Sequence, residues 1–261
     1  MDTFEYKYRD NNAFFRYAKG ESLMRGDEIH PFYEILYYMG GDATLLTEKF
    51  ESKLNNNSLI IIPKECYHKF KILNQNNYTR LFIQFSLTAD TELTYNNIFS
   101  EIRVVTPNNY ILSVLNRITE VLSEICYAES KNNLLKSALP MLLAELSATS
   151  FTVQPTLRKD EHLITKCINF IDNRLNTPLF VSDIAREMGV SVSTLHLCFK
   201  DHLGISIYKY ITEKRLILAH KMISQGDKPT KIFTDCGFND YPTFFKAYKK
   251  KFGVSPTKTN M

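Results

Sequence analysis

The chain has 261 residues, of which 44% are hydrophobic and 23% charged, as expected for an ordinary protein with one large or two smaller domains. No apolar run approaches the ~18 residues of a membrane span, no signal peptide is visible, and the five cysteines form no CxxC pair. These features argue against a membrane protein, a disulfide scaffold and a cysteine-ligated metal site, and they predict a cytoplasmic, reduced protein.

Residues 1–106 have the pattern of a β-rich domain. Three stretches have strand character: Leu81–Leu87, in which apolar residues alternate, the short apolar run Leu59–Ile62, and the aromatic and aliphatic run Phe32–Met39. Polar turn signals separate them at Gly40–Asp42, Asn55–Asn57 and Asn74–Asn77. Several short strands at regular spacing predict a β-sandwich or a β-barrel.

Three side chains in this part, His30, Glu34 and His68, are of the metal-ligand type. Such a set inside a small barrel could hold a divalent metal, but Phe32 occupies the position where a second histidine is usually needed. The alternatives are the rim of an effector pocket and hydrogen-bonded structural histidines. Ring faces and hydroxyls suited to a sugar-sized pocket come from Tyr37, Tyr38, Tyr67 and Tyr78. We expect no metal and no cofactor, and we assign effector binding to His30, Glu34, Tyr38 and His68.

Residues 107–150 change to helical periodicity. A heptad-like seam of about two heptads runs through Ile111, Leu115, Ile118, Leu122 and Ile125. A second helix follows, and Pro140 is expected to kink it. These helices either only cover the β-domain or form a dimer contact through the first of them. Residues 151–159 lose the periodicity and contain Pro155, which predicts an interdomain linker.

Residues 160–258 are predicted to form an all-helical domain, which begins with a helix over 160–176. One pattern then occurs twice, and corresponding residues lie 48 or 49 positions apart: Ile184 and Ile232, Gly189 and Gly237, Leu195 and Phe244, Phe199 and Tyr248, Gly204 and Gly253. Each copy is predicted to form a helix, a glycine turn and a second helix with its apolar residues four positions apart. This is the arrangement of a helix-turn-helix unit, whose second helix can enter the DNA major groove. The two units span about 179–200 and 227–250, and a helix over 206–225 connects them.

The positive charge of the chain is concentrated in this C-terminal part. Residues 160–261 hold 15 Lys and Arg against 10 Asp and Glu, whereas residues 1–159 hold 17 against 18. A net positive domain is what binding to DNA phosphates requires. Taken alone, the run Lys249–Lys251 is equally consistent with a solvated helix face.

Residues 160–258 resemble the C-terminal domain of the AraC/XylS family of bacterial transcription regulators. The resemblance is carried by Ile184-Ala185, Gly189, Ser191–Leu195, Phe199-Lys200, Gly204, Ser206, Tyr210, Arg215-Leu216, Ala219, Gly237–Asp240, Tyr248-Lys249 and Gly253–Pro256. A weaker resemblance, through His30–Ile35 and Ile62-Pro63 followed by His68, is to the family's cupin-like effector barrel. It implies a small-molecule effector, often a sugar, dimerisation through the helices after the barrel, and seven helices that read two successive major-groove faces. We therefore favour a homodimer that binds double-stranded DNA, acts as an activator, and has RNA polymerase as a further partner.

Carried over residue by residue, the resemblance and the internal repeat assign two sets of DNA contacts. The base-facing residues are Ser193, His196 and Leu197 in the first unit and Pro242, Phe245 and Lys246 in the second. The phosphate contacts are Ser191, Thr194, Lys200, Lys249 and Lys250. Many relatives carry Arg at the position of Leu197. The leucine side chain cannot donate a hydrogen bond to guanine, so it would contact a thymine methyl group or make no base-specific contact.

Three positions depart from the family pattern. Phe233 stands in the second unit where the family has a small residue, such as Ala185 at the equivalent position of the first unit. Phe180 replaces a Ser or Thr N-cap in the first unit. Pro229 replaces a β-branched residue before Thr230, the expected N-cap of the second unit. The second unit is therefore expected to dock less rigidly than the first.

The predicted fold is α+β with two domains: a cupin-like β-barrel with two covering or dimerising helices, and an all-α domain with two helix-turn-helix units. The favoured function is an effector-responsive transcription regulator that is not an enzyme. The alternatives are a regulator whose barrel binds a partner protein and a metal-dependent cupin enzyme fused to a DNA-binding domain. The incomplete ligand set argues against the enzyme, and metal analysis of the purified protein discriminates between them.

Overall fold

The computed structural model describes residues 3–10, 12–20, 29–124, 128–150 and 162–259. Contacts between Cα atoms divide the chain into two compact units. The first comprises residues 1–26, 32–46 and 51–157, and the second comprises residues 27–31, 47–50 and 158–261. Ile125, at the end of the predicted heptad seam, and the predicted linker 151–159 lie outside the described residues.

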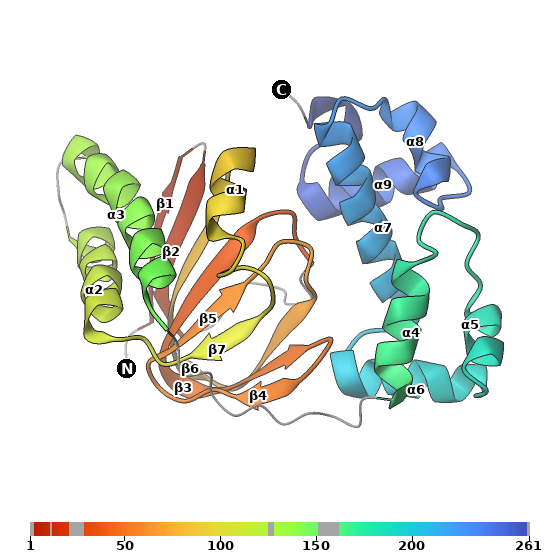
Figure 1. Cartoon of the computed structure of the whole chain (residues 1–261), viewed down its shortest axis with the longest axis horizontal. Helices are drawn as coiled ribbons and strands as arrows, with labels where there is room; N and C mark the ends of the chain where they lie inside the picture. Colours follow the sequence, from red (N-terminus) through yellow and green to blue (C-terminus); the bar gives the residue numbers. More distant parts are fainter. Residues whose placement is uncertain (1–2, 11, 21–28, 125–127, 151–161, 260–261) are drawn as a thin grey trace. The chain divides into compact units, whose positions relative to one another are not determined.

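One seven-stranded sheet forms the framework of the first unit (Figure 1). Its strands are β1 (Phe4–Arg9), β2 (Ala13–Lys19), β3 (Tyr33–Thr47), β4 (Glu51–Lys53), β5 (Ser58–Ile62), β6 (His68–Phe85) and β7 (Arg103–Val105). They follow the order β1-β2-β6-β3-β5-β7, with β4 paired to β3. Among the described residues the end strands β1 and β7 pair only with β2 and β5, respectively, so the sheet does not close on itself. The prediction of a closed cupin-like barrel is therefore wrong in its closure.

Two predicted turns are strand interior instead. The signals Gly40–Asp42 and Asn74–Asn77 lie within β3 and β6, and only Asn55–Asn57 is a turn. Gly41 has φ +130, and a Cβ atom placed on it would lie 3.0 Å from the Cα of Tyr78. Glycine is thus needed where the two backbones approach closely, and this requirement comes from the neighbouring strand rather than from the local sequence.

Within the described residues the helices of the first unit are α1 (Ala89–Tyr95), α2 (Asn109–Ser123) and α3 (Ala128–Ala148). The predicted seam of α2 is buried, since Ile111, Leu115, Ile118 and Leu122 are each at most 1% exposed and belong to the same core cluster as the strand residues. The seam therefore packs inside its own domain, as the covering alternative expected. Any dimer contact through these helices would have to use other residues, such as Tyr110 and Met141, which are exposed.

The second unit is helical, with α4 (His162–Asp172), α5 (Val181–Glu187), α6 (Val192–Leu203), α7 (Ile207–Ser224), α8 (Pro229–Asp235), α9 (Tyr241–Phe252) and a 3-10 helix at Pro256–Lys258. The helices α5 and α6 form the first predicted helix-turn-helix unit, and α8 and α9 form the second (Figure 1). The connecting helix α7 contacts α6, α8 and α9. Among the described residues, no helix has the length and apolar character to cross a membrane.

Candidate nucleic-acid interface and effector site

Each helix-turn-helix unit bends at the glycine that the internal repeat identified. Gly189 has φ +68 and Gly237 has φ +77, the left-handed conformation that glycine adopts without a steric penalty. The second helix of each unit then begins at a side-chain cap. Ser191 accepts a hydrogen bond from the Thr194 N–H at 3.0 Å, and Asp240 accepts one from the Thr243 N–H at 2.7 Å.

The second helices, α6 and α9, each bury one face. Leu195 and Phe199 on α6, and Phe244 and Tyr248 on α9, are completely buried, which confirms the predicted apolar face. The predicted DNA-contacting residues lie on the remaining face, because they recur at spacings of three and four. Of these residues, the exposed ones are Ser191, Ser193, Thr194, Leu197, Lys200, Pro242, Lys246, Lys249 and Lys250, and the half-buried ones are His196 and Phe245.

Two of the predicted phosphate contacts have a local structural role as well. The hydroxyls of Ser191 and Thr194 lie 2.8 Å apart, so they are hydrogen-bonded to each other at the start of α6. A phosphate at this end of α6 would therefore meet capping hydroxyls and helix N–H groups together. The imidazole of His196 lies beside the exposed ring of Tyr208, with 5.4 Å between ring centroids. Tyr208 was not among the predicted contacts, since it lies outside both repeats.

The lysines at the end of α9 have different environments. Lys251 forms an ion pair with Glu213 of α7, and both side chains are mostly buried. Lys249 and Lys250, by contrast, are exposed, and among the described residues no ion pair involves them. At the start of the same helix, the Thr243 backbone hydrogen bond holds the pKa of Asp240 below its ordinary value, and the charge of Lys246 acts in the same direction. α9 therefore presents Lys246, Lys249 and Lys250 to solvent, with Asp240 fixed as the capping anion.

The departures from the family pattern have specific structural outcomes. Phe180 is the N-cap of α5, makes no side-chain capping bond and is 63% exposed. The prediction of Thr230 as an N-cap is wrong: Lys228 is the N-cap, and α8 begins at Pro229, two residues earlier than predicted. Proline suits the first helical position because that N–H has no partner within the helix. Phe233 is half-buried and packs edge-on against Tyr241 at the start of α9, with 5.8 Å between ring centroids.

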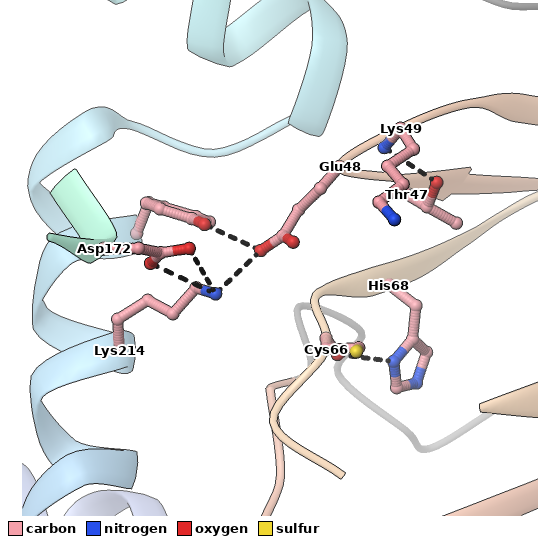
Figure 2. A network of polar contacts seen from close by, with 8 residues as sticks. Thr47, Glu48, Lys49, Cys66, His68, Asp172 and Lys214 are labelled. Atoms are coloured by element: carbon pink, nitrogen blue, oxygen red, sulfur yellow. Dashed lines mark hydrogen bonds and ion pairs between the residues drawn. The ribbon is translucent and has the colours of Figure 1, made fainter. Parts of the chain in front are cut away.

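A polar network surrounds α7 within the second unit (Figure 2). The Lys214 ammonium lies 3.0 Å from a carboxylate oxygen of Glu48 and 3.4 Å from one of Asp172. The hydroxyl of Tyr210 donates to Glu48 at 2.7 Å. Burial would lower the pKa of Lys214, but the two carboxylates outweigh it and raise the pKa above its ordinary value. Lys214 is therefore a charged, buried link between α7 and α4.

In the first unit, two of the predicted effector residues lie close together. Glu34 on β3 and His68 at the start of β6 are buried, with 3.7 Å between a Glu34 carboxylate oxygen and His68 Nε2. Gln84 on β6 donates to the other carboxylate oxygen of Glu34 at 2.7 Å, and His68 Nδ1 lies 3.2 Å from the Cys66 carbonyl oxygen (Figure 2). A carbonyl only accepts, so this hydrogen bond places a proton on Nδ1 and directs Nε2 toward Glu34.

The other two predicted effector residues are also buried. His30, which belongs to the second unit, is 6% exposed and precedes β3. Tyr38 on β3 is fully buried, with its ring 5.9 Å from that of Tyr78, and burial raises the pKa of its hydroxyl, helped by the charge of Asp42.

Sequence reasoning missed a buried cation in the same sheet. Arg80 on β6 has no exposed surface, donates to the carbonyl oxygens of Gly20 and Tyr78 at 2.8 and 2.9 Å, and lies over the Tyr78 ring. Burial lowers the pKa of Arg80 to about 10. Arginine in an alternating strand pattern reads as a surface residue, so the local sequence carried no signal for this position.

Comparison with known proteins bears on the C-terminal part. The family described as "Helix-turn-helix domain" matches residues 184–261. The probable transcriptional regulator LumQ of Photobacterium leiognathi is 30% identical over 91 residues, which cover 34% of this chain and 37% of that protein. The HTH-type transcriptional activator RhaS of Mannheimia succiniciproducens is 22% identical over 238 residues, 88% of this chain and 87% of that protein. These matches to transcription regulators confirm the resemblance inferred from the repeated motif, and the family match covers residues 184–261.

Solved structures with similarity to this chain fall into two groups. A regulator with an AraC-type DNA-binding domain from Chromobacterium violaceum is 30% identical, covers 38% of this chain and 88% of its own, and has a TM-score of 0.36. ToxT from Vibrio cholerae is 15% identical, covers 98% of this chain and 96% of its own, and has a TM-score of 0.42. Among the curated relatives the extent of similarity also differs: the chain spans 37% of LumQ but 87% of RhaS.

Proposed function

We propose that this protein is a transcription regulator that binds double-stranded DNA through α6 and α9. The observation that carries the proposal is the pair of capped helices, each with a buried apolar face and an exposed face that bears the predicted contacts. Two such helices on one connecting helix suit two successive major-groove faces. The net positive charge of residues 160–261 supports the same function, because phosphate neutralisation supplies much of the affinity for DNA.

We further assign the roles within each helix. Ser193, His196 and Leu197 on α6, and Pro242, Phe245 and Lys246 on α9, face the bases, while Ser191, Thr194, Lys200, Lys249 and Lys250 contact phosphates. RhaS is named a transcriptional activator, and this favours activation through contact with RNA polymerase. A regulator of this kind acts in the cytoplasm, where the DNA is, and a homodimer would place two copies on one operator.

The test of DNA binding is selection of bound sequences from random double-stranded DNA, followed by footprinting of the selected site. We expect one enriched motif with two protected major-groove faces about one helical turn apart. Protection of a single face would contradict the assignment of the second unit. No enrichment over the starting pool would contradict the proposed function as a whole.

For the first unit we propose a small-molecule effector with hydroxyl groups, such as a carbohydrate. What supports it is the buried Glu34 carboxylate, held by Gln84 and close to His68, since a carboxylate and an imidazole are typical partners of sugar hydroxyls. Tyr38, also on β3, completes the proposed site within this unit, whereas His30, the fourth predicted effector residue, belongs to the second unit. A thermal-shift screen with sugars and other metabolites tests this, with Glu34→Gln as the matched variant. A ligand that stabilises both proteins equally would contradict the role of Glu34.

A further inference from the structure

Three consecutive residues in one turn of α7 contact other elements of the second unit. Glu213 pairs with Lys251 of α9. Lys214 pairs with Asp172 of α4, as Figure 2 shows. The third residue of this turn, Arg215, contacts a segment of each half of the domain. The connecting helix is therefore attached to both halves through consecutive side chains.

The guanidinium of Arg215 is fixed by two hydrogen bonds on the side of the first helix-turn-helix unit. Its Nε donates to the carbonyl oxygen of Leu175 at 3.1 Å, and its Nη2 donates to that of Thr177 at 2.9 Å. Both carbonyls lie in the segment between α4 and α5, immediately before the first unit. A planar fork with two donors suits two neighbouring carbonyl oxygens, and a lysine ammonium cannot reproduce that geometry.

The same guanidinium packs against the turn of the second helix-turn-helix unit. A Cβ atom added to Gly237 would lie 2.5 Å from Cζ and Nε of Arg215 and 2.6 Å from Nη2. Gly237 is the turn glycine between α8 and α9, so its lack of a side chain lets this turn rest directly on the Arg215 plane. One side chain thus lies between the entrance of the first unit and the turn of the second.

We propose that Arg215 is a positioning residue that fixes the separation of α6 and α9, and so sets which spacing between two DNA boxes the protein accepts. This inference rests on the proposed DNA binding. When α6 and α9 are held rigidly, both can bind at once, and so increase the affinity, only where the two DNA boxes, one bound by each helix, lie at the matching distance and angle. A looser support accepts several spacings but binds the preferred one less tightly.

The test uses the full chain and the selected two-box site, with one base pair added to or removed from the spacer. Each added base pair rotates the second box by roughly 34–36° and moves it by about 3.4 Å. We expect wild-type affinity to fall about tenfold or more on the altered spacers. For Arg215→Lys we expect less than about a threefold difference between spacers, with affinity for the original site reduced by a similar factor.

Two further variants and a DNA with a single box distinguish a positioning role of Arg215 from a general effect of its substitution on protein stability. Gly237→Ala disturbs the contact from the opposite side and should flatten the spacing preference in the same way. Arg186→Lys is the matched control, because Arg186 is exposed and, among the described residues, its ion pair is with Asp183 of the same helix; it should keep the wild-type preference. On DNA with a single box, Arg215→Lys should bind within about twofold of wild type, since no spacing is involved.

Each outcome decides between these roles. A wild-type spacing preference in both Arg215→Lys and Gly237→Ala would overturn the inference, as would an equal loss on single-box DNA or loss of folding in both variants. If only one variant fails to fold, by circular dichroism, the other decides. A wild-type protein that selects no DNA would instead remove the proposed function, and this inference with it.

Discussion

The lysine run of α9 offers a sharp test of the DNA contacts, because neighbouring lysines have different surroundings. Lys249 is exposed and is assigned to a phosphate, whereas Lys251 is mostly buried against Glu213. Each phosphate contact contributes a slope of about −0.9 to the dependence of log affinity on log salt concentration. Lys249→Ala should therefore reduce the magnitude of the slope by about 0.9 for each bound protomer.

The expected size of the effect follows from that slope. Between 50 and 200 mM salt the concentration rises about fourfold. Over this range the affinity of wild type should therefore fall about 3.5-fold more than the affinity of Lys249→Ala, which lacks one phosphate contact. The assay is fluorescence anisotropy with the selected site at several salt concentrations. Selection from random DNA should return the same motif for Lys249→Ala as for wild type, because phosphate contacts carry no sequence information.

Lys251→Ala is the matched control for charge. It removes the same charge from the same helix, but from an ion pair inside the domain, so it should lower stability and leave the salt slope near that of wild type. An unaltered slope in Lys249→Ala, or an equal reduction in both variants, would refute the distinction drawn from burial.

Three further predictions concern single side chains. Phe180→Ser supplies the missing cap of α5 and should raise the free energy of unfolding by about 0.5–1 kcal/mol in urea titrations, whereas Phe180→Ala should not. Burial, aided by the charge of Lys251, lowers the pKa of His220; the unfolded chain therefore takes up the proton first as pH falls below the ordinary value of 6.5, and stability is lost in that range. The decline between about pH 7 and pH 5.5 should be smaller in His220→Gln, and an equal decline would contradict this linkage. Leu197→Ala should change the preference at one base position by about fivefold while other positions stay the same in sequence selection.

The helical domain was largely predictable because its signals are local. The burial of Leu195 and Phe199 follows from a spacing of four on one helix. The turn at Gly189 follows from a glycine at the end of the preceding helix, α5. The N-cap of α8 departs from the prediction because Pro229 suits the first helical position, which makes Lys228 the N-cap and places Thr230 inside the helix.

The sheet was less predictable because its constraints come from distant residues. Gly41 had the composition of a turn, but the backbone at Tyr78 requires a glycine inside a strand at that position. The burial of Arg80 depends on carbonyl oxygens at Gly20 and Tyr78, which no periodicity of β6 reveals. Glu34 and His68 could be named as a pair from their chemistry, but their hydrogen bonding to Gln84 and the Cys66 carbonyl could not.

We expect the two helix-turn-helix units to contribute unequally to DNA binding. On α9, two exposed lysines, Lys249 and Lys250, are assigned to phosphates, whereas on α6 Lys200 is the one lysine so assigned, so most of the electrostatic attraction to phosphates is expected on α9. On α6, the exposed Leu197 cannot donate to a base, which leaves less affinity but a defined apolar contact. We therefore expect α9 to bind DNA more strongly but with little discrimination between sequences, and α6 to bind more weakly through an apolar contact. Specificity then requires both helices to bind at the same time. That requirement makes the contact of Arg215 with both units matter for recognition as well as for folding.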